Sequence, residues 1–219
     1  MTLEAFLRIA LVQTLLYGLG SVFAFVYFGK RSRYILAIGA LCLASVLGDV
    51  ISHVLLSFRI NPNYSASVYH ILALPIVSMI YFSVTNNKNK WTFILIASLY
   101  LLFGIVNLLF IQQQTINSYT LIMMSIIILI YCLYYFYWLL KELPTMHLHK
   151  LPMFWINSAF MIYFAGNLFL FVFTSYLVSV LKDNLLVYWS LHNFLGIIEM
   201  TMIIFALWMD LQNIKLHSS

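Results

Sequence analysis

The stretch LIMMSIIILIYCLYYFY, from Leu121 to Tyr137, decides the fold, because it is apolar on every face. A helix needs roughly 20 apolar residues to cross a bilayer core, and lipid offers no hydrogen-bond partner to an open backbone. A segment of this kind must therefore close its own hydrogen bonds as a helix. The alternation of polar and apolar residues that marks a transmembrane barrel strand is absent from it. The stretch predicts a transmembrane helix.

Six further stretches of the same character fill most of the 219-residue chain. Hydrophobic residues make up 64% and charged residues 8% of the sequence, whereas soluble domains have about half and about a quarter. The composition therefore excludes an ordinary soluble domain. We predict an all-α fold, in which residues 1–219 form a single domain of seven transmembrane helices. The expected spans are residues 3–29, 34–58, 66–85, 91–111, 118–140, 152–180 and 185–209.

Basic residues predict the orientation of this bundle. Eight lie in segments expected on one side of the membrane, namely Lys30, Arg31, Arg33, Lys88, Lys90, Lys141, Lys150 and Lys215. Only Arg8, Arg59 and Lys182 lie on the other side. Because short cytoplasmic loops are enriched in Lys and Arg, the N-terminus is expected outside and the C-terminus in the cytoplasm, with the bacterial inner (plasma) membrane as the location. The scattered basic residues, with a net charge of +5, favour membrane lipids as partners and no nucleic acid.

Several polar residues interrupt the apolar spans at similar depths. The candidate site consists of Asp49, His53, His70, Asn167, His192 and Asn193. Asp49 and His53 are four residues apart and therefore share a helix face. Ionisable groups in the hydrocarbon region are costly unless they are paired or face water. The pattern predicts a polar pocket in the outer half of the membrane, with Glu199 deeper, in the cytoplasmic half.

Two parts of the chain repeat a polar pattern. Gly48-Asp49 is followed by His70 near the start of the next span, and Gly166-Asn167 is followed in the same way by His192. This predicts two parallel three-helix units, spans one to three and five to seven, joined by span four. Parallel repeats of this kind place a binding site at the interface between the units.

These observations favour a membrane protein of sensor or transporter type that is not an enzyme. Its outer-half pocket would bind a small ligand, an ion or a proton, and histidine suits proton-linked switching because its reference pKa is about 6.5. No connection between the spans is long enough for a nucleotide-binding or kinase domain. Any signal would therefore leave through a membrane or cytoplasmic signalling partner.

The alternative function comes from a resemblance. The layout of Ser45, Asp49, His53, His70 and His192 resembles the alkaline-ceramidase and adiponectin-receptor superfamily of intramembrane zinc hydrolases. That resemblance implies a Zn ion held by His53, His70 and His192 and hydrolysis of a lipid amide or ester. The superfamily carries a second histidine one turn along helix seven, where this chain has Gly196, which is why the non-enzymatic function is preferred.

Over most of its length the chain resembles uncharacterised small seven-helix proteins of Bacteroidota. The segments FWIN (154–157), YFAGN (163–167) and WSLH (189–192) carry this likeness. It implies the seven-helix fold and no particular activity.

Overall fold

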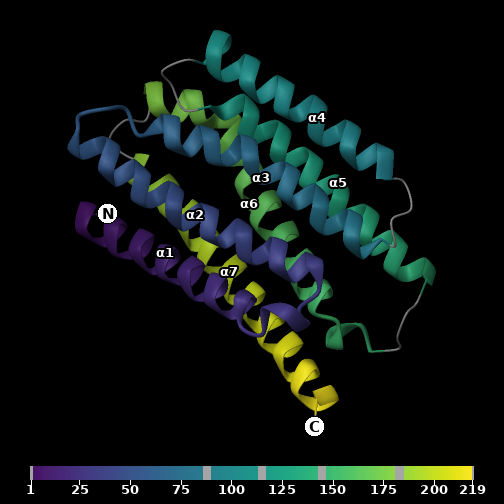
Figure 1. Ribbon diagram of the computed structural model, residues 1–219. Helices are drawn as coiled ribbons and strands as arrows, with labels where there is room; N and C mark the ends of the chain where they lie inside the picture. Colours follow the sequence, from purple (N-terminus) through teal and green to yellow (C-terminus); the bar gives the residue numbers. More distant parts are fainter. Residues whose placement is uncertain (1, 86–89, 113–116, 143–146, 181–184, 219) are drawn as a thin grey trace.

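The computed structural model describes residues 2–85, 90–112, 117–142, 147–180 and 185–218, and within them every regular element is a helix (Figure 1). The long helices are α1 (Leu3–Phe25), α2 (Arg33–Ser57), α3 (Asn63–Val84), α4 (Lys90–Val106), α5 (Ser118–Glu142), α6 (Pro152–Val180) and α7 (Leu185–Ser218). Three short elements connect or extend them: η1 (Phe28–Lys30), η2 (Asn107–Ile111) and η3 (Leu148–Lys150).

Seven helices of the described chain are long and apolar enough to cross a membrane. This confirms the prediction of an all-α, seven-helix integral membrane protein. α3 begins at Asn63 rather than 66, and α4 gives way to η2 after Val106. Two further ends differ for reasons that the structure shows. α1 stops at Phe25 rather than 29, because Tyr27 takes a left-handed backbone conformation with φ of 57° and a separate turn, η1, follows. α7 continues to Ser218 rather than 209, and at 1.5 Å per residue it is about 50 Å long, more than a bilayer core needs.

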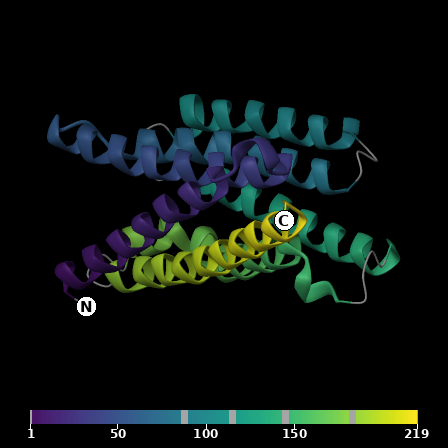
Figure 2. The same cartoon turned by 60° about the horizontal axis from the view of Figure 1, so that its bottom comes forward.

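Six of the seven helices form a closed ring. α1 packs against α2 and α7, α3 packs against α2 and α5, and α6 packs against α5 and α7. α4 packs on the outside of this ring, against α3 and α5, and Figure 1 shows it at the edge of the bundle. In Figure 2 the ribbons of α2, α3 and α4 form a layer over those of α6 and α7.

Buried polar groups tie α3, α5 and α6 together inside the ring. The Tyr81 hydroxyl donates to Asn157 Oδ1 at 2.7 Å, and the Asn157 amide donates to the backbone carbonyl of Cys132 at 3.4 Å. Tyr81 and Asn157 are fully buried, so their polar groups depend on these contacts and on Cys132, whose Sγ lies 3.2 Å from the Tyr81 hydroxyl. This part of the interior is therefore packed and closed.

Arg31 joins three elements at the end of the bundle where α1 finishes. Its guanidinium donates to the carbonyls of Phe23 at 2.8 Å and Val26 at 3.1 Å, which caps the last turn of α1. The same group forms an ion pair with Asp210 of α7. The Arg31 side chain is 0% exposed and that of Asp210 is 16% exposed. Arg31 is thus a buried structural residue, not a free loop cation.

Small residues let α1 and α2 approach closely near this same end. A Cβ atom built on Gly39 of α2 would lie 2.7 Å from the Ala24 Cβ of α1. Only a residue without a side chain permits this separation. Towards their other ends, α1 and α2 contribute residues to a cavity instead of packing against each other in this way.

Candidate functional site

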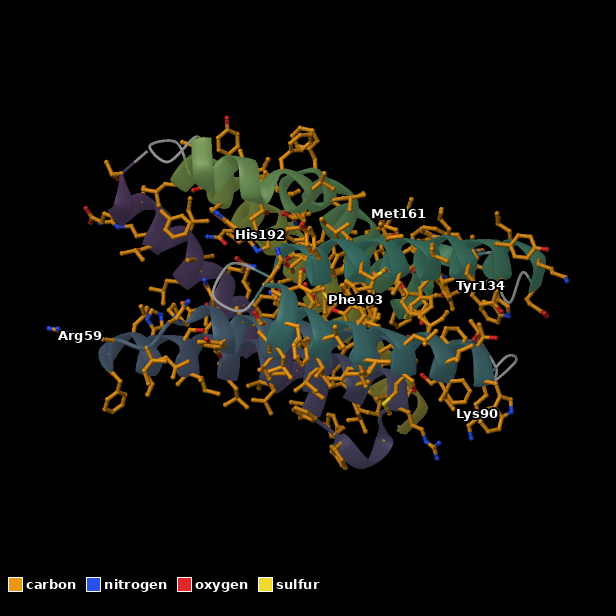
Figure 3. The ribbon with its side chains drawn as sticks, turned by 90° about the horizontal axis from the view of Figure 1, so that it is seen from above. Arg59, Lys90, Phe103, Tyr134, Met161 and His192 are labelled. Carbon is orange, nitrogen blue, oxygen red and sulfur yellow. The ribbon has the colours of Figure 1, made fainter. Side chains whose placement is uncertain are left out.

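A cavity of about 710 Å³, called here the central cavity, lies inside the six-helix ring. All six ring helices contribute to its walls, and α4 contributes none. It occupies the end of the bundle where α1, α3, α5 and α7 begin. Figure 3 shows His192 of the cavity wall towards the end that carries Arg59, with Lys90 and Tyr134 at the opposite end.

The floor of the central cavity is apolar. The deepest wall residues on four of the helices are Ile38, Val77, Ile128 and Ile203, and each is at most 2% exposed. Polar side chains lie above them. The cavity therefore combines an apolar base with a polar upper part, as small-molecule sites commonly do.

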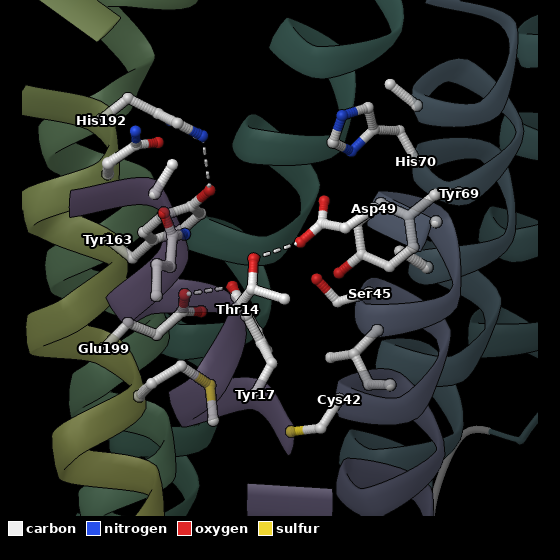
Figure 4. Close-up of a pocket in the computed structure, with 18 of the residues that line it drawn as sticks. Thr14, Tyr17, Cys42, Ser45, Asp49, Tyr69, His70, Tyr163, His192 and Glu199 are labelled. Atoms are coloured by element: carbon white, nitrogen blue, oxygen red, sulfur yellow. Dashed lines mark hydrogen bonds between the residues drawn. The ribbon is translucent and has the colours of Figure 1, made fainter. Parts of the chain in front are cut away.

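Two carboxylates face the central cavity from opposite walls (Figure 4). Asp49 of α2 accepts a hydrogen bond from the Thr14 hydroxyl at 2.6 Å. Glu199 of α7, only 4% exposed, accepts one from the Tyr17 hydroxyl at 3.3 Å. Among the described residues neither carboxylate forms a salt bridge, and the cavity wall includes no Lys or Arg. The cavity is an acidic chamber within the membrane-spanning part of the chain.

His192 is held in place by α6. The Asn167 amide donates to the Tyr163 carbonyl at 2.9 Å, so its Oδ1 accepts from His192 Nδ1 at 2.9 Å. The other ring nitrogen, Nε2, lies 3.4 Å from the Tyr163 hydroxyl. A neutral imidazole with its proton on Nδ1 satisfies both contacts. Asn167 is fully buried and does not line the cavity; it orients a residue that does.

Two polar groups of the cavity wall have no hydrogen-bond partner among the described residues. They are Nδ1 of His70 and Nδ2 of Asn193, both buried atoms. Asn193 as a whole is 8% exposed. Buried polar atoms are nearly always hydrogen-bonded in native proteins, and a lone one calls for an explanation such as a bound group. Both atoms belong to residues that surround the same space.

The structure brings most of the predicted site together. Asp49, His53, His70, His192 and Asn193 all line the central cavity, and Asn167 supports it from behind. His53, however, is an exposed residue, four positions beyond Asp49 towards the end of α2.

The predicted histidine cluster needs correction. No group of three or more His, Cys, Asp or Glu in the described parts of the chain could hold a metal ion. In the described structure His53, His70 and His192 do not come together as such a group. Figure 4 shows the reason for two of them, because His70 and His192 stand on opposite sides of the cavity. Similar depth in the membrane does not bring side chains on different helices together.

Several polar residues of the cavity wall could not be recognised from the sequence, among them Thr14, Tyr17, Tyr69 and Tyr163. Ser45 was noted only for the resemblance to zinc hydrolases, and Glu199 was assigned to a separate, deeper level. An intramembrane carboxylate is itself a functional signal, so Glu199 could have been included. The tyrosines had no such signal, because tyrosine in a membrane helix is typical of the lipid–water interface.

No protein-family model, curated protein or solved structure matches this chain. The likenesses to Bacteroidota proteins and to intramembrane zinc hydrolases remain expectations from the sequence.

Proposed function

We propose that this chain is a sensor or transporter that binds a small ligand, ion or proton in the central cavity. One observation carries the proposal: two carboxylates that have no ion-pair partner among the described residues face a cavity of about 710 Å³ between membrane-spanning helices. Burying such groups costs several kcal/mol unless water or a ligand compensates, and residues of this kind mark substrate and ion pathways. The volume falls within the range of small-molecule sites.

A second cavity at the opposite end of the bundle supports the transporter form of this proposal. It has a volume of about 530 Å³ and lies between α2, α3, α5 and α6, with Arg33 and Trp138 in its wall. α2, α3, α5 and α6 also line the central cavity. Two cavities that share four helices and lie towards opposite ends of the bundle are consistent with an alternating-access cycle.

The packing also supports the proposed two-unit repeat. α2 packs between α1 and α3, just as α6 packs between α5 and α7, and the units meet through α3 with α5 and through α7 with α1. The central cavity lies between them. The polar pairing differs, because Asn167 binds His192 whereas the matching His70 leaves Nδ1 without a partner among the described residues.

We infer that the central cavity opens to the outer side of a bacterial inner membrane. Arg31 is buried in an ion pair and is left out of the count of loop charges. Seven basic residues then remain on the side assigned to the cytoplasm and three on the other side, so the orientation is unchanged. A green fluorescent protein fused after Ser219 should therefore fluoresce, and alkaline phosphatase fused at the same position should be inactive. Active phosphatase with a dark fluorescent protein would instead place the C-terminus outside and the cavity towards the cytoplasm.

Labelling a cysteine tests whether water reaches the central cavity. In a Cys42→Ala/Cys132→Ala background, Ser45→Cys places a thiol in the cavity wall, and Leu47→Cys places one on the outward face of the same helix, where Leu47 is 51% exposed. In lipid nanodiscs, maleimide should modify the first and not the second, because only a hydrated thiol ionises and reacts. An unreactive Ser45→Cys protein of normal folding would refute the proposed binding function.

A further inference from the structure

We propose that the central cavity binds a small organic ammonium ion, a protonated amine attached to an apolar body. This inference rests on the proposed function and names its ligand class. Four features of the cavity carry it: charge, size, aromatic lining and a buried group without a partner.

Asp49 and Glu199 set the charge of the cavity. Both face it, and within the described parts of the chain their hydrogen-bond partners are hydroxyl groups, those of Thr14 and Tyr17. Glu199 is buried and Asp49 is half-buried, and a carboxylate withdrawn from water needs a proton, a metal or an organic cation to offset its charge. Among the described wall residues there is no Lys or Arg to supply that charge. His192 does not supply it either, because its contacts are satisfied by the neutral ring.

The size of the cavity helps to decide whether a proton, a metal ion or an organic cation offsets the charge. A metal ion needs several converging ligands, and the described residues offer no such group of His, Cys, Asp or Glu. A proton alone would need no space, yet the cavity encloses about 710 Å³. Most ligand sites of this volume are largely apolar with a few placed polar groups. An organic cation uses both the volume and the charge.

The aromatic lining fits the same class of ligand. Tyr17, Tyr69 and Tyr163 all line the cavity, and Figure 4 shows Tyr17 beside Glu199 and Tyr69 beside Asp49. Faces of tyrosine rings attract ammonium groups, and the attraction is larger where water is excluded. Each carboxylate is thus accompanied by an aromatic side chain.

Asn193 is evidence for a bound molecule that does not depend on the charge or size of the cavity. It is 8% exposed, it lines the cavity, and its Nδ2 has no hydrogen-bond partner among the described residues. A buried amide N–H without an acceptor is unfavourable. An oxygen on the bound molecule, such as a hydroxyl or carbonyl, would accept this hydrogen bond while the ammonium group contacts a carboxylate.

The first test compares charged thiol reagents on the Ser45→Cys protein in the cysteine-free background. A methanethiosulfonate bearing an ethylammonium group should react faster than one bearing an ethylsulfonate, by about tenfold or more beyond their ratio on a free thiol, because acidic clefts concentrate cations. Asp49→Asn and Glu199→Gln should each reduce this preference. Glu142→Gln makes the same chemical change on an exposed residue at the other end of α5 from the cavity and should leave the preference unchanged.

The second test measures protection of the same thiol from uncharged N-ethylmaleimide. We expect 2-phenylethylamine to slow the reaction, and 2-phenylethanol at the same concentration to have little effect. Glu199→Gln, checked for folding by thermal unfolding, should abolish the protection. Equal protection by amine and alcohol, no protection by either, or faster reaction with the anionic reagent would overturn the ammonium assignment. Those outcomes leave the proposed function intact, which fails only if the Ser45→Cys thiol is unreactive.

Discussion

Replacing Arg31 by methionine is expected to lower the free energy of unfolding by about 3–5 kcal/mol, the cost of breaking a buried ion pair from one side. The substitution leaves Asp210 without its cation and two carbonyls of the last turn of α1 without their donor. Both losses act where α1, α2 and α7 meet. Unfolding of the purified protein in mixed detergent–SDS micelles, followed by circular dichroism, measures the change.

A matched control for this change exists on α1. Arg8 pairs with Glu4 at the i, i+4 spacing, and both side chains are at least 74% exposed. Arg8→Met removes the same kind of partner and should cost less than about 0.5 kcal/mol, because exposed pairs contribute little. The double change Arg31→Met/Asp210→Leu should lower the free energy of unfolding less than Arg31→Met alone, since no unpaired charge remains. Equal losses for Arg31→Met and Arg8→Met would show that the buried pair does not hold these helices.

Gly39→Ala is expected to destabilise the protein by about 1–3 kcal/mol, the usual cost of overpacking. The added methyl group would lie 2.7 Å from the Cβ of Ala24 and 3.2 Å from the ring of Phe25. Ala24 has no rotamer through which it could move aside, so α1 must shift as a whole. The same unfolding titration measures the loss.

Gly18→Ala provides the comparison for Gly39→Ala. A Cβ at Gly18 meets no atom within 4 Å, and alanine has a better helix propensity than glycine by about 1 kcal/mol. This variant should therefore match or exceed the native stability. If Gly39→Ala proves equally stable, α1 and α2 do not pack as closely as described.

These two regions matter for the central cavity because α1 forms one of its walls. Thr14 and Tyr17 are the partners of the two carboxylates, and both lie on the helix that Arg31 and Gly39 hold against its neighbours. A variant that loosens α1 should therefore also weaken the cation preference at Ser45→Cys. The effect would be indirect, so restoring the packing with a second-site change at Ala24, such as Ala24→Gly beside Gly39→Ala, should restore it.

The sequence predicted how deep the site residues lie in the membrane better than it predicted which way their side chains point around the helix axis. Asp49, His70 and His192 were expected at one level, and all three line one cavity. Depth follows directly from residue number, because a helix rises 1.5 Å per residue. Direction does not: His53 is exposed, and Asn167 lies behind His192 instead of in the cavity wall.

By itself, the sequence determined that this chain is a bundle of seven helices long and apolar enough to span a membrane, because lipid leaves a long apolar segment no other way to satisfy its backbone. Tertiary structure alone decided which polar side chains meet. The usual guide to a buried face is the contrast between a polar and an apolar side, and in lipid both sides of a helix are apolar. Tyr17 could therefore be assigned to the cavity, as the partner of Glu199, only once the packing of α1 against α7 had fixed its rotation.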